Sequence, residues 1–327
     1  LSGTHTFTNN GTMTWPGTAN NIAYNGGTIT LQNNGAFNLS APSFLHFNGD
    51  PSATFTFWNN TGGSITKSTT STSTFDSFVS VYTNTGSAMT VSAGTLSLTG
   101  NCNVGGTLVV NNSATLTANN ISFSGPTLTN NGTLNTTNLQ VVGASNQTIN
   151  GNGSILNMTV ANPSGITLGG SQSFNGLLTL TTGKIRTFAH TISILSTGNI
   201  SSGSSSSYVN GFIQRSFPAG TTTLNFPVGD DNVYTPVSLT INGLLLSDEF
   251  RIHSWGNDHP QVGTSSIISD LSVNRYWSID QSANQIFSTA DFTLNWDATD
   301  VDLDATTSNF GVGSYYSDAS IWSIATS

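Results

Sequence analysis

The amino-acid sequence predicts an all-β protein, with a right-handed parallel β-helix (a solenoid) over residues 1–207 and an antiparallel β-sandwich over residues 208–327. Three observations predict this fold. Only 6% of the residues are charged, and Thr, Ser, Asn and Gly, all poor helix formers, dominate the chain. A short motif recurs every 20 residues or so in the first two thirds. The charge balance then changes near residue 210.

The recurring motif is a glycine or serine followed by alternating polar and apolar residues. Clear copies are Gly27-Thr-Ile-Thr-Leu31 and Gly94-Thr-Leu-Ser-Leu98. An alternation of period two places Leu96 and Leu98 on one face of a strand and the hydroxyl residues on the other. Each copy of the motif therefore predicts one short strand with a single buried face.

The spacing of the motif distinguishes a solenoid from other β folds. Gly86 and Gly106 are 20 residues apart, and Gly132 and Gly153 are 21 residues apart. Connections this short leave no room for a helical crossover, so a parallel sheet must coil directly on itself. With about three strands in each turn, about ten turns are expected. At roughly 4.8 Å per turn they form a rod about 45–50 Å long.

The solenoid interior is expected to hold the inward residues of every turn, stacked into apolar columns. Outward Thr and Ser are expected to form ladders, and Asn residues at the corners to stack through hydrogen bonds. The single cysteine, Cys102, occupies a buried position in the alternation, so we expect an inert thiol. The predicted core residues are Leu96, Leu98, Leu108, Val110, Leu116, Leu128, Leu134, Leu139, Val141, Ile149, Ile155, Ile166, Leu168, Leu178, Leu180, Ile192 and Ile194.

Residues 40–85 fit the repeat less well because they are dense in aromatic side chains. The favoured interpretation is that these rings fill a wider part of the core. The alternative is an exposed aromatic strip that stacks on sugars, with Trp58 as its first candidate. The aromatic residues are Phe44, Phe47, Phe55, Phe57, Trp58, Phe75, Phe78 and Tyr82.

The charge asymmetry marks the domain boundary. Residues 1–212 contain two acids and three bases, whereas residues 213–327 contain thirteen acids and three bases, so the two parts carry +1 and −10. The second part has longer alternating segments separated by turn residues, which is typical of a sandwich. Trp255, Trp277, Trp296 and Trp322 are expected to anchor its core. The predicted strands are Tyr208–Phe217, Thr222–Val228, Thr235–Asn242, Glu249–Trp255, Arg275–Ile279, Phe292–Asp297, Gly311–Tyr316 and Ile321–Ile324.

The motifs of the second part resemble a module of large secreted proteins of Bacteroidota, in which it follows a β-helical repeat region. They are Tyr208–Phe217, Phe226-Pro-Val-Gly229, Tyr234-Thr-Pro-Val237, Arg275-Tyr-Trp-Ser-Ile279 and Leu294-Asn-Trp-Asp297. This resemblance to type IX secretion substrates implies export to the cell surface and a role in adhesion, surface coats or filaments. The start of the chain, already strand-like, is expected of a processed or excised segment.

Composition excludes several functional classes. A net charge of −9 and a pI near 4.5 argue against nucleic-acid binding. No apolar run reaches about 18 residues, so no membrane insertion is expected. A polysaccharide-degrading solenoid needs paired carboxylates, and the predicted rod offers only Asp50 and Asp76, with Lys67 between them. We therefore expect no enzyme activity and no catalytic residue.

The acidic segment near residue 300 is the candidate metal site. Asp297, Asp300, Asp302 and Asp304 place four carboxylates in eight residues, a density that suits calcium. The segment lacks the glycine and the terminal glutamate of an EF-hand. A solvated acidic loop is the favoured interpretation, and calcium, the only cofactor considered, is the alternative. Asp230-Asp231-Asn232 is a weaker candidate.

Together these features predict an extracellular structural protein of a bacterial cell surface. We expect a filament subunit or the stalk of an adhesin, in which copies associate into a homopolymer through strand and end-to-end contacts. A carbohydrate-binding adhesin is the alternative, with glycans as partners. A degenerate polysaccharide-degrading enzyme is a third, weaker hypothesis.

Overall fold

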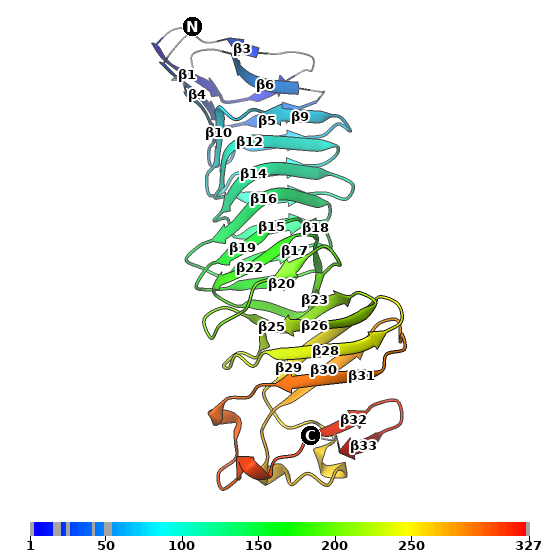
Figure 1. The fold of residues 1–327 in the computed structure, drawn as a ribbon. Coiled ribbons are helices and arrows are strands. Elements are labelled where there is room, and N and C mark those ends of the chain that lie inside the picture. The colour runs from blue at the N-terminus through cyan, green and yellow to red at the C-terminus, as the bar shows by residue number, and fades with distance from the viewer. Residues whose placement is uncertain (1–2, 16–20, 24–26, 41–42, 49–53, 325–327) are drawn as a thin grey trace. The chain divides into compact units, whose positions relative to one another are not determined.

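The computed structural model describes residues 3–15, 21–23, 27–40, 43–48 and 54–324, of which 21–23, 43–48 and 324 are described by their backbone alone (Figure 1). Strands account for 59% of the chain and helix for 4%, which confirms the all-β class. Contacts divide the chain into two compact units, Leu1–Ser202 and Gly203–Ser327. This division lies a few residues before the predicted boundary at residue 207.

The first unit is a parallel β-solenoid of about ten turns. Each turn contributes one strand to each of three faces, and equivalent strands of successive turns pair in parallel and in register. The first face contains β1 (Gly3–Asn9), β4 (Gly27–Asn33), β7 (Thr54–Asn59), β10 (Val79–Thr83), the ends of β12 (Thr95–Val104), β14 (Thr115–Phe123) and β16 (Thr133–Val142), β19 (Met158–Ala161), β22 (Leu177–Thr182) and β24 (Asn199–Ile200).

The other two faces follow the same pattern. The second face contains β2 (Thr12–Trp15), β5 (Ala36–Leu39), β8 (Ser64–Lys67), β11 (Ala88–Val91), β13 (Thr107–Val110), β15 (Thr127–Asn130), β17 (Gln147–Asn150), β20 (Ile166–Gly169) and the start of β23 (Ile185–Ile194). The third face contains β3 (Asn21–Ala23), β6 (Ser43–Asn48), β9 (Thr72–Phe75), the starts of β12, β14 and β16, β18 (Ser154–Ile155), β21 (Gln172–Phe174) and the end of β23.

Every residue predicted for the solenoid core is buried. The aromatic segment follows the same alternation, because Phe55, Phe57 and Phe75 point inward and are almost fully buried. Phe57 packs against Phe75 in the same interior, with ring centroids 5.7 Å apart. These three rings agree with the core-filling interpretation, but Trp58 and Tyr82 lie on the outer face and Phe78 is 43% exposed, so it holds for only part of the segment. The side chains of Phe44 and Phe47 lie outside the described residues.

Asparagines stack in a hydrogen-bonded ladder inside one corner, as predicted. The Asn9 side-chain amide donates to the Asn33 carbonyl oxygen at 2.7 Å, and Asn33 donates to Asn59 at 2.7 Å. Asn33 also donates to the backbone carbonyls of Gly35 and Ser64, each at 3.0 Å. The ladder therefore pairs buried polar groups that the tight corner would otherwise leave without partners.

A second, solvent-exposed ladder runs along the adjacent position of the same corner. Its amide-to-amide distances are 2.7–3.0 Å, and its members are Asn10, Asn34, Asn60 and Asn84. Glycine follows at this corner because successive turns approach closely: a Cβ on Gly35 would overlap the carbonyl oxygen of Gly11. The Asn-Gly step thus occurs at the first two members of this ladder, Asn10-Gly11 and Asn34-Gly35, whereas threonine follows Asn60 and Asn84.

Cys102 lies in an inward column between Val81 and Ile121 and is 2% exposed. Burial raises the pKa of its thiol to about 12. We expect the folded protein not to react with a thiol reagent such as DTNB at pH 8, since the reactive thiolate is absent there and the sulfur is inaccessible. Stoichiometric reaction in denaturant is the control, and rapid labelling of the folded chain would contradict the packing.

The second unit has two antiparallel sheets, as expected of a sandwich. All eight predicted strands are present, shifted by at most a few residues at their ends. One sheet has the order β25 (Val209–Phe217), β29 (Asp248–Trp255) and β30 (Tyr276–Gln281), with β27 (Val228–Gly229) parallel to β25. The other has the order β26 (Gly220–Phe226), β28 (Val237–Leu244) and β31 (Thr289–Leu294). The unit also contains the hairpin β32 (Gly313–Tyr316) and β33 (Ile321–Ile324) and the 3₁₀ turns η1 (Val262–Thr264), η2 (Ser269–Leu271), η3 (Ala298–Asp300) and η4 (Thr307–Asn309).

Phenylalanines, not tryptophans, form the centre of this unit. Phe217 lies between Phe226, 6.4 Å away on the facing sheet, and Phe250, 5.0 Å away on its own sheet. The prediction of four tryptophan core anchors is wrong. Trp296 is 45% exposed beyond the end of β31, and the other three are only half-buried, because each lies on an outer sheet face, an edge strand or the terminal hairpin. They are Trp255, Trp277 and Trp322.

Candidate functional site

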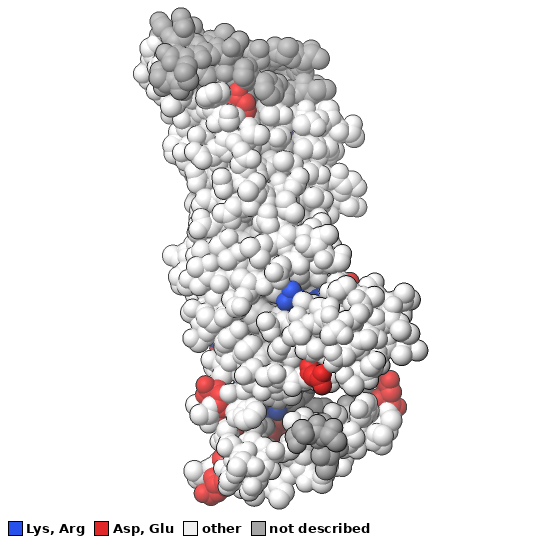
Figure 2. All heavy atoms as spheres, viewed as in Figure 1, with Lys and Arg blue, Asp and Glu red and all other residues white. Residues whose placement is uncertain are grey.

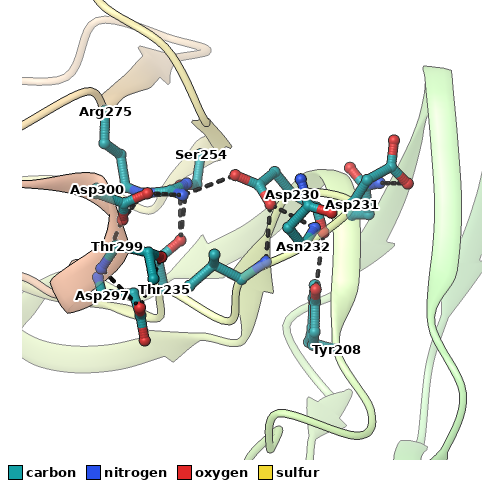
Figure 3. Close-up of polar contacts among 12 residues, drawn as sticks. Tyr208, Asp230, Asp231, Asn232, Thr235, Ser254, Arg275, Asp297, Thr299 and Asp300 are labelled. Atoms are coloured by element: carbon teal, nitrogen blue, oxygen red, sulfur yellow. Dashed lines mark hydrogen bonds and ion pairs between the residues drawn. The ribbon is translucent and has the colours of Figure 1, made fainter.

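The most highly connected polar site of the described residues is centred on Arg275, in the second unit. Arg275 directly precedes β30, and its side chain has no exposed surface. Its guanidinium lies between two carboxylates, that of Asp230 after β27 and that of Asp300 in η3 (Figure 3). The site therefore joins segments that are far apart in the sequence.

All five N–H groups of the Arg275 guanidinium have a partner. Nε donates to Asp300 Oδ2 at 2.8 Å, and one terminal nitrogen donates to Asp300 Oδ1 at 2.9 Å and Asp230 Oδ2 at 2.7 Å. The other terminal nitrogen donates to Ser254 Oγ at 2.9 Å and Thr235 Oγ1 at 3.4 Å. A guanidinium has five donors in a fixed fork, so none is left for a ligand.

The two carboxylates also bind the backbone of their own loops. Asp230 Oδ1 accepts the N–H groups of Asn232 at 2.7 Å and Val233 at 2.8 Å. Burial alone would raise the pKa of Asp230, but these bonds and the guanidinium outweigh it and hold the pKa below its usual range. Asp300 Oδ2 accepts the N–H of Asp297 at 3.0 Å, within a capping box of η3. Asp230 is therefore ionised near neutral pH, and both carboxylates are held by hydrogen bonds in a structural clamp.

The four aspartates predicted as a calcium site are engaged separately. Asp300 is bound to Arg275, and Asp297 caps η3 through the N–H of Thr299 at 2.9 Å. Asp302 accepts from the Ser272 N–H and the Asn274 amide at 2.8 and 2.6 Å, and Asp304 is exposed. Within the described residues, no three His, Cys, Asp or Glu side chains are grouped to hold a metal ion.

Asp297 and Asp304 are exposed, as a solvated acidic loop requires, but Asp300 fits neither interpretation of the segment. Asp300 is neither solvated nor available to a cation, since a buried arginine occupies both of its oxygens. Asp230, the weaker calcium candidate, binds the same arginine, and its neighbour Asp231 accepts from the Asn210 amide at 2.9 Å. The spacing of the acids along the chain therefore did not identify their partner.

His253 is a buried histidine on the outer face of β29. Its ring lies 4.7 Å from that of Phe212 and 3.9 Å from that of Trp255. Burial lowers the pKa of His253 to about 4, although the charge of Asp230 opposes the shift. The imidazole is therefore neutral in the folded protein down to about pH 4, whereas in the unfolded chain it gains a proton near pH 6.5.

This difference predicts a pH dependence of stability. Between pH 6.5 and about 4, His253 is protonated in the unfolded state but neutral in the folded state. Protons therefore bind preferentially to the unfolded state, and the free energy of unfolding falls as the pH falls. Allowing for residual solvent screening, we expect a loss of about 2 kcal/mol across this window. Urea unfolding at pH 7, 5.5 and 4 measures it. His253→Leu should flatten the curve, and an unchanged slope in that variant would assign the dependence to another group.

The structure places Trp58 on the outer face of β7, where it stacks on Tyr82 of the next turn. Their ring centroids are 4.4 Å apart and the planes differ by 19°. In register, Trp58 lies between Gln32 and Tyr82, and the Tyr82 ring covers one face of the Trp58 ring. The two rings form a stack along the solenoid instead of the side-by-side platform that sugar stacking uses.

Two residues of the considered hydrolytic site have structural roles. The Asp76 carboxylate, 7% exposed, accepts the N–H of Phe78 at 3.0 Å in the turn before β10. Lys67 points into the solenoid, where its amine donates to the hydroxyl of Thr69 at 2.8 Å and to the Thr69 carbonyl. Burial lowers the pKa of Lys67. Asp50 lies outside the described residues.

The Arg275 clamp was not predicted from the sequence, although the strand alternation carries a signal for it. In the predicted strand Arg275–Ile279, the side chains of Arg275 and Tyr276 point to opposite faces. Tyr276 lies on the outer face, where its ring stacks on that of Trp255. An arginine at an inward position requires buried partners of opposite charge. The alternation could therefore have indicated a buried ion pair for Arg275, but not which of the thirteen acids of the second part completes it.

No family model, curated protein or solved structure shows significant similarity to the chain. Within the described residues there is also no helix of sufficient length and apolar character to span a bilayer.

Proposed function

We propose that this chain is an extracellular structural protein of a bacterial cell surface, either the subunit of a filament or the stalk of an adhesin. The observation that most strongly supports this proposal is the uncharged, repetitive exterior of the solenoid. In the view of Figure 2 the atoms of this unit are almost all those of uncharged residues, whereas acidic atoms gather on the second unit.

The exterior repeats because outward residues stack in register. One column of the third face reads Thr95, Thr115, Thr133, Ser154 and Ser173, so a hydroxyl stands at the same position in five successive turns. Neutral hydroxyl columns avoid the charge repulsion that keeps most proteins apart at high concentration. This supports a role in which the surface packs against copies of itself or spans a distance.

The interior supports the same role. Apolar columns and a buried asparagine ladder connect each turn to the next. The unit is therefore stabilised by contacts between neighbouring turns along its axis. A scaffold of this kind resists bending without requiring a ligand or a metal. The proposal assigns no catalytic residue.

Electron microscopy of the purified chain tests the proposal. At high protein concentration we expect elongated assemblies, and sedimentation should show species larger than the monomer. Isolated particles at every concentration and ionic strength would overturn the filament role. For the stalk role, the measurement is whether cells that display the chain lose attachment when it is deleted.

A groove on the solenoid favours the second candidate, a carbohydrate-binding adhesin. It has a volume of about 370 Å³, and residues of four successive turns line it. Amides and hydroxyls line it, among them those of Asn131, Thr133, Asn152 and Ser154. Such groups bind sugar hydroxyls, so Asn152→Ala should weaken glycan binding on an array while Trp58→Ala leaves it unchanged. The reverse result would favour the aromatic site.

A further inference from the structure

Strand β31 forms an open edge of the second unit. Its sheet has the order β26-β28-β31, and β31 pairs with β28 over Thr289–Leu294. Within the described part of the chain no strand pairs with its other edge. The N–H and C=O groups of that edge are thus available to a further strand.

The inward side chains of β31 are incompletely covered. Phe292 is 42% exposed, although its register partner Leu239 on β28 is fully buried. Leu294 is half-buried, whereas its partner Val237 is 1% exposed. Since register partners point to the same face, the apolar face of the sheet is complete at β28 and uncovered at β31. One more strand is needed to cover it.

The β31 edge lacks most of the features that protect edges, since its one charged residue, Asp291, is bound by the Asn242 amide at 2.8 Å. The sequence Thr289-Ala-Asp-Phe-Thr-Leu294 contains no Lys, Arg or Pro, and its pairing with β28 is regular. The opposite edge, β26, has an irregularity between Gly220 and Thr222, and Gly220 has a φ of 102°. Bulges, prolines and lysines are the usual means of preventing strand addition, so only β26 is guarded.

We propose that a second copy of this chain pairs with β31 in antiparallel fashion across a two-fold axis, continuing the sheet through both subunits. The sequence of the strand is self-complementary in a register that pairs residues 290–294 with the same residues of the second copy. With Phe292 on the axis, Ala290 lies opposite Leu294 of the partner subunit, and Asp291 lies opposite Thr293 of the partner subunit.

This register satisfies both faces of the strand. A small side chain opposes a large one on the apolar face, and a hydroxyl donor opposes a carboxylate acceptor on the polar face. A register with Asp291 on the axis would place two carboxylates opposite each other, which is unfavourable. A register shifted by one residue would mix the faces. The Asn242 amide, which donates to Asp291 at 2.8 Å, holds this carboxylate on the polar face.

The pairing deepens the proposed structural function and rests on it, because it specifies one surface for self-association. A two-fold contact closes on itself, so it makes dimers and leaves longer assemblies to other surfaces. The second unit thus joins two solenoids, and the apolar face of β31 becomes part of a continuous six-stranded sheet.

Phe292→Lys tests the pairing, with Thr223→Lys on the guarded edge β26 as the matched control. Light scattering coupled to size exclusion should show dimers for the parent chain and for Thr223→Lys. In Phe292→Lys, at least a tenfold weaker dimer is expected, because a lysine at an edge blocks strand addition. Equal dissociation in both variants, or none in either, would overturn the pairing. Circular dichroism checks that both variants fold.

Cysteine cross-linking tests the register without removing Phe292. In Asp291→Cys/Thr293→Cys, each new cysteine faces one on the partner, so oxidation should produce a covalent dimer. Asp291→Cys alone should not cross-link, and Cys102 is buried in the other unit and takes no part. Filaments without these cross-links would overturn the pairing alone. Cross-linked dimers that never form longer assemblies would retain the pairing and overturn the filament role.

Discussion

Replacement of Arg275 by methionine should destabilise the second unit by about 3–5 kcal/mol, the largest effect of any single substitution we expect. Methionine has the length of the arginine stem but no charge, so Asp230 and Asp300 would remain buried beside each other without a cation. The Ser254 and Thr235 hydroxyl oxygens would also lose the guanidinium N–H groups that donate to them. Chemical unfolding followed by tryptophan fluorescence measures the loss.

Arg251→Met is the matched control for this substitution. Arg251 forms an ion pair with Asp280 at 2.8 Å, but the two side chains are 40% and 51% exposed. Exposed pairs contribute about 0–1 kcal/mol, so the control should be close to the parent chain. The triple variant Asp230→Asn/Arg275→Met/Asp300→Asn should recover part of the loss, because it also removes the uncompensated charges. Equal costs for Arg275→Met and Arg251→Met would show that the clamp is not desolvated.

Asn33→Ala should destabilise the solenoid by about 3 kcal/mol. Asn33 is completely buried, and its amide donates to the Asn59 oxygen and to the carbonyls of Gly35 and Ser64. It also accepts the Asn9 amide. Alanine would remove all four bonds. The Asn9 amide would keep its bond to the Ala36 carbonyl and the Gly35 carbonyl its bond from the Ser64 N–H, but the Asn59 oxygen would lose the Asn33 amide inside the core. Each buried group left unpaired costs roughly 1–3 kcal/mol before the structure relaxes. Thermal unfolding monitored by circular dichroism measures the effect.

The neighbouring position is the control for the ladder. Asn34 makes the same kind of amide contacts, to Asn10 at 2.8 Å and from Asn60 at 2.7 Å, but it does so in solvent. Water replaces the lost partners there, so Asn34→Ala should cost less than about 1 kcal/mol. A similar loss at both positions would show that amide stacking as such stabilises the turns. A negligible loss at Asn33 would contradict the ladder.

Much of the solenoid followed from local alternation. Leu96, Leu98 and their equivalents are buried because a period of two orients each side chain, and a period near 20 brings equivalent positions into register. The asparagine ladders followed from the same repeat, since Asn9, Asn33 and Asn59 recur at equivalent corners. These features depend on the residue itself and on its copy in the next turn.

The candidate sites were harder to predict because their partners are distant in sequence. The cluster around Asp300 suggested calcium by its acid density, but the arginine that binds Asp300 is 25 positions away and Asp230 is on another loop. Trp58 suggested a sugar platform, yet the solenoid register places Tyr82 directly against its ring. Composition and spacing describe which groups are present, not which group lies opposite.

The sequence by itself determined the β class, the parallel coil, its buried columns, the eight strands of the second unit and the uncharged exterior, because strand alternation and a fixed repeat length are local properties. Only the tertiary structure decided that Arg275 occupies the acids, that phenylalanines displace tryptophans from the core, and that β31 is left without a partner on one edge. Each of these depends on which strands become neighbours, and that choice is made by the packing of whole sheets.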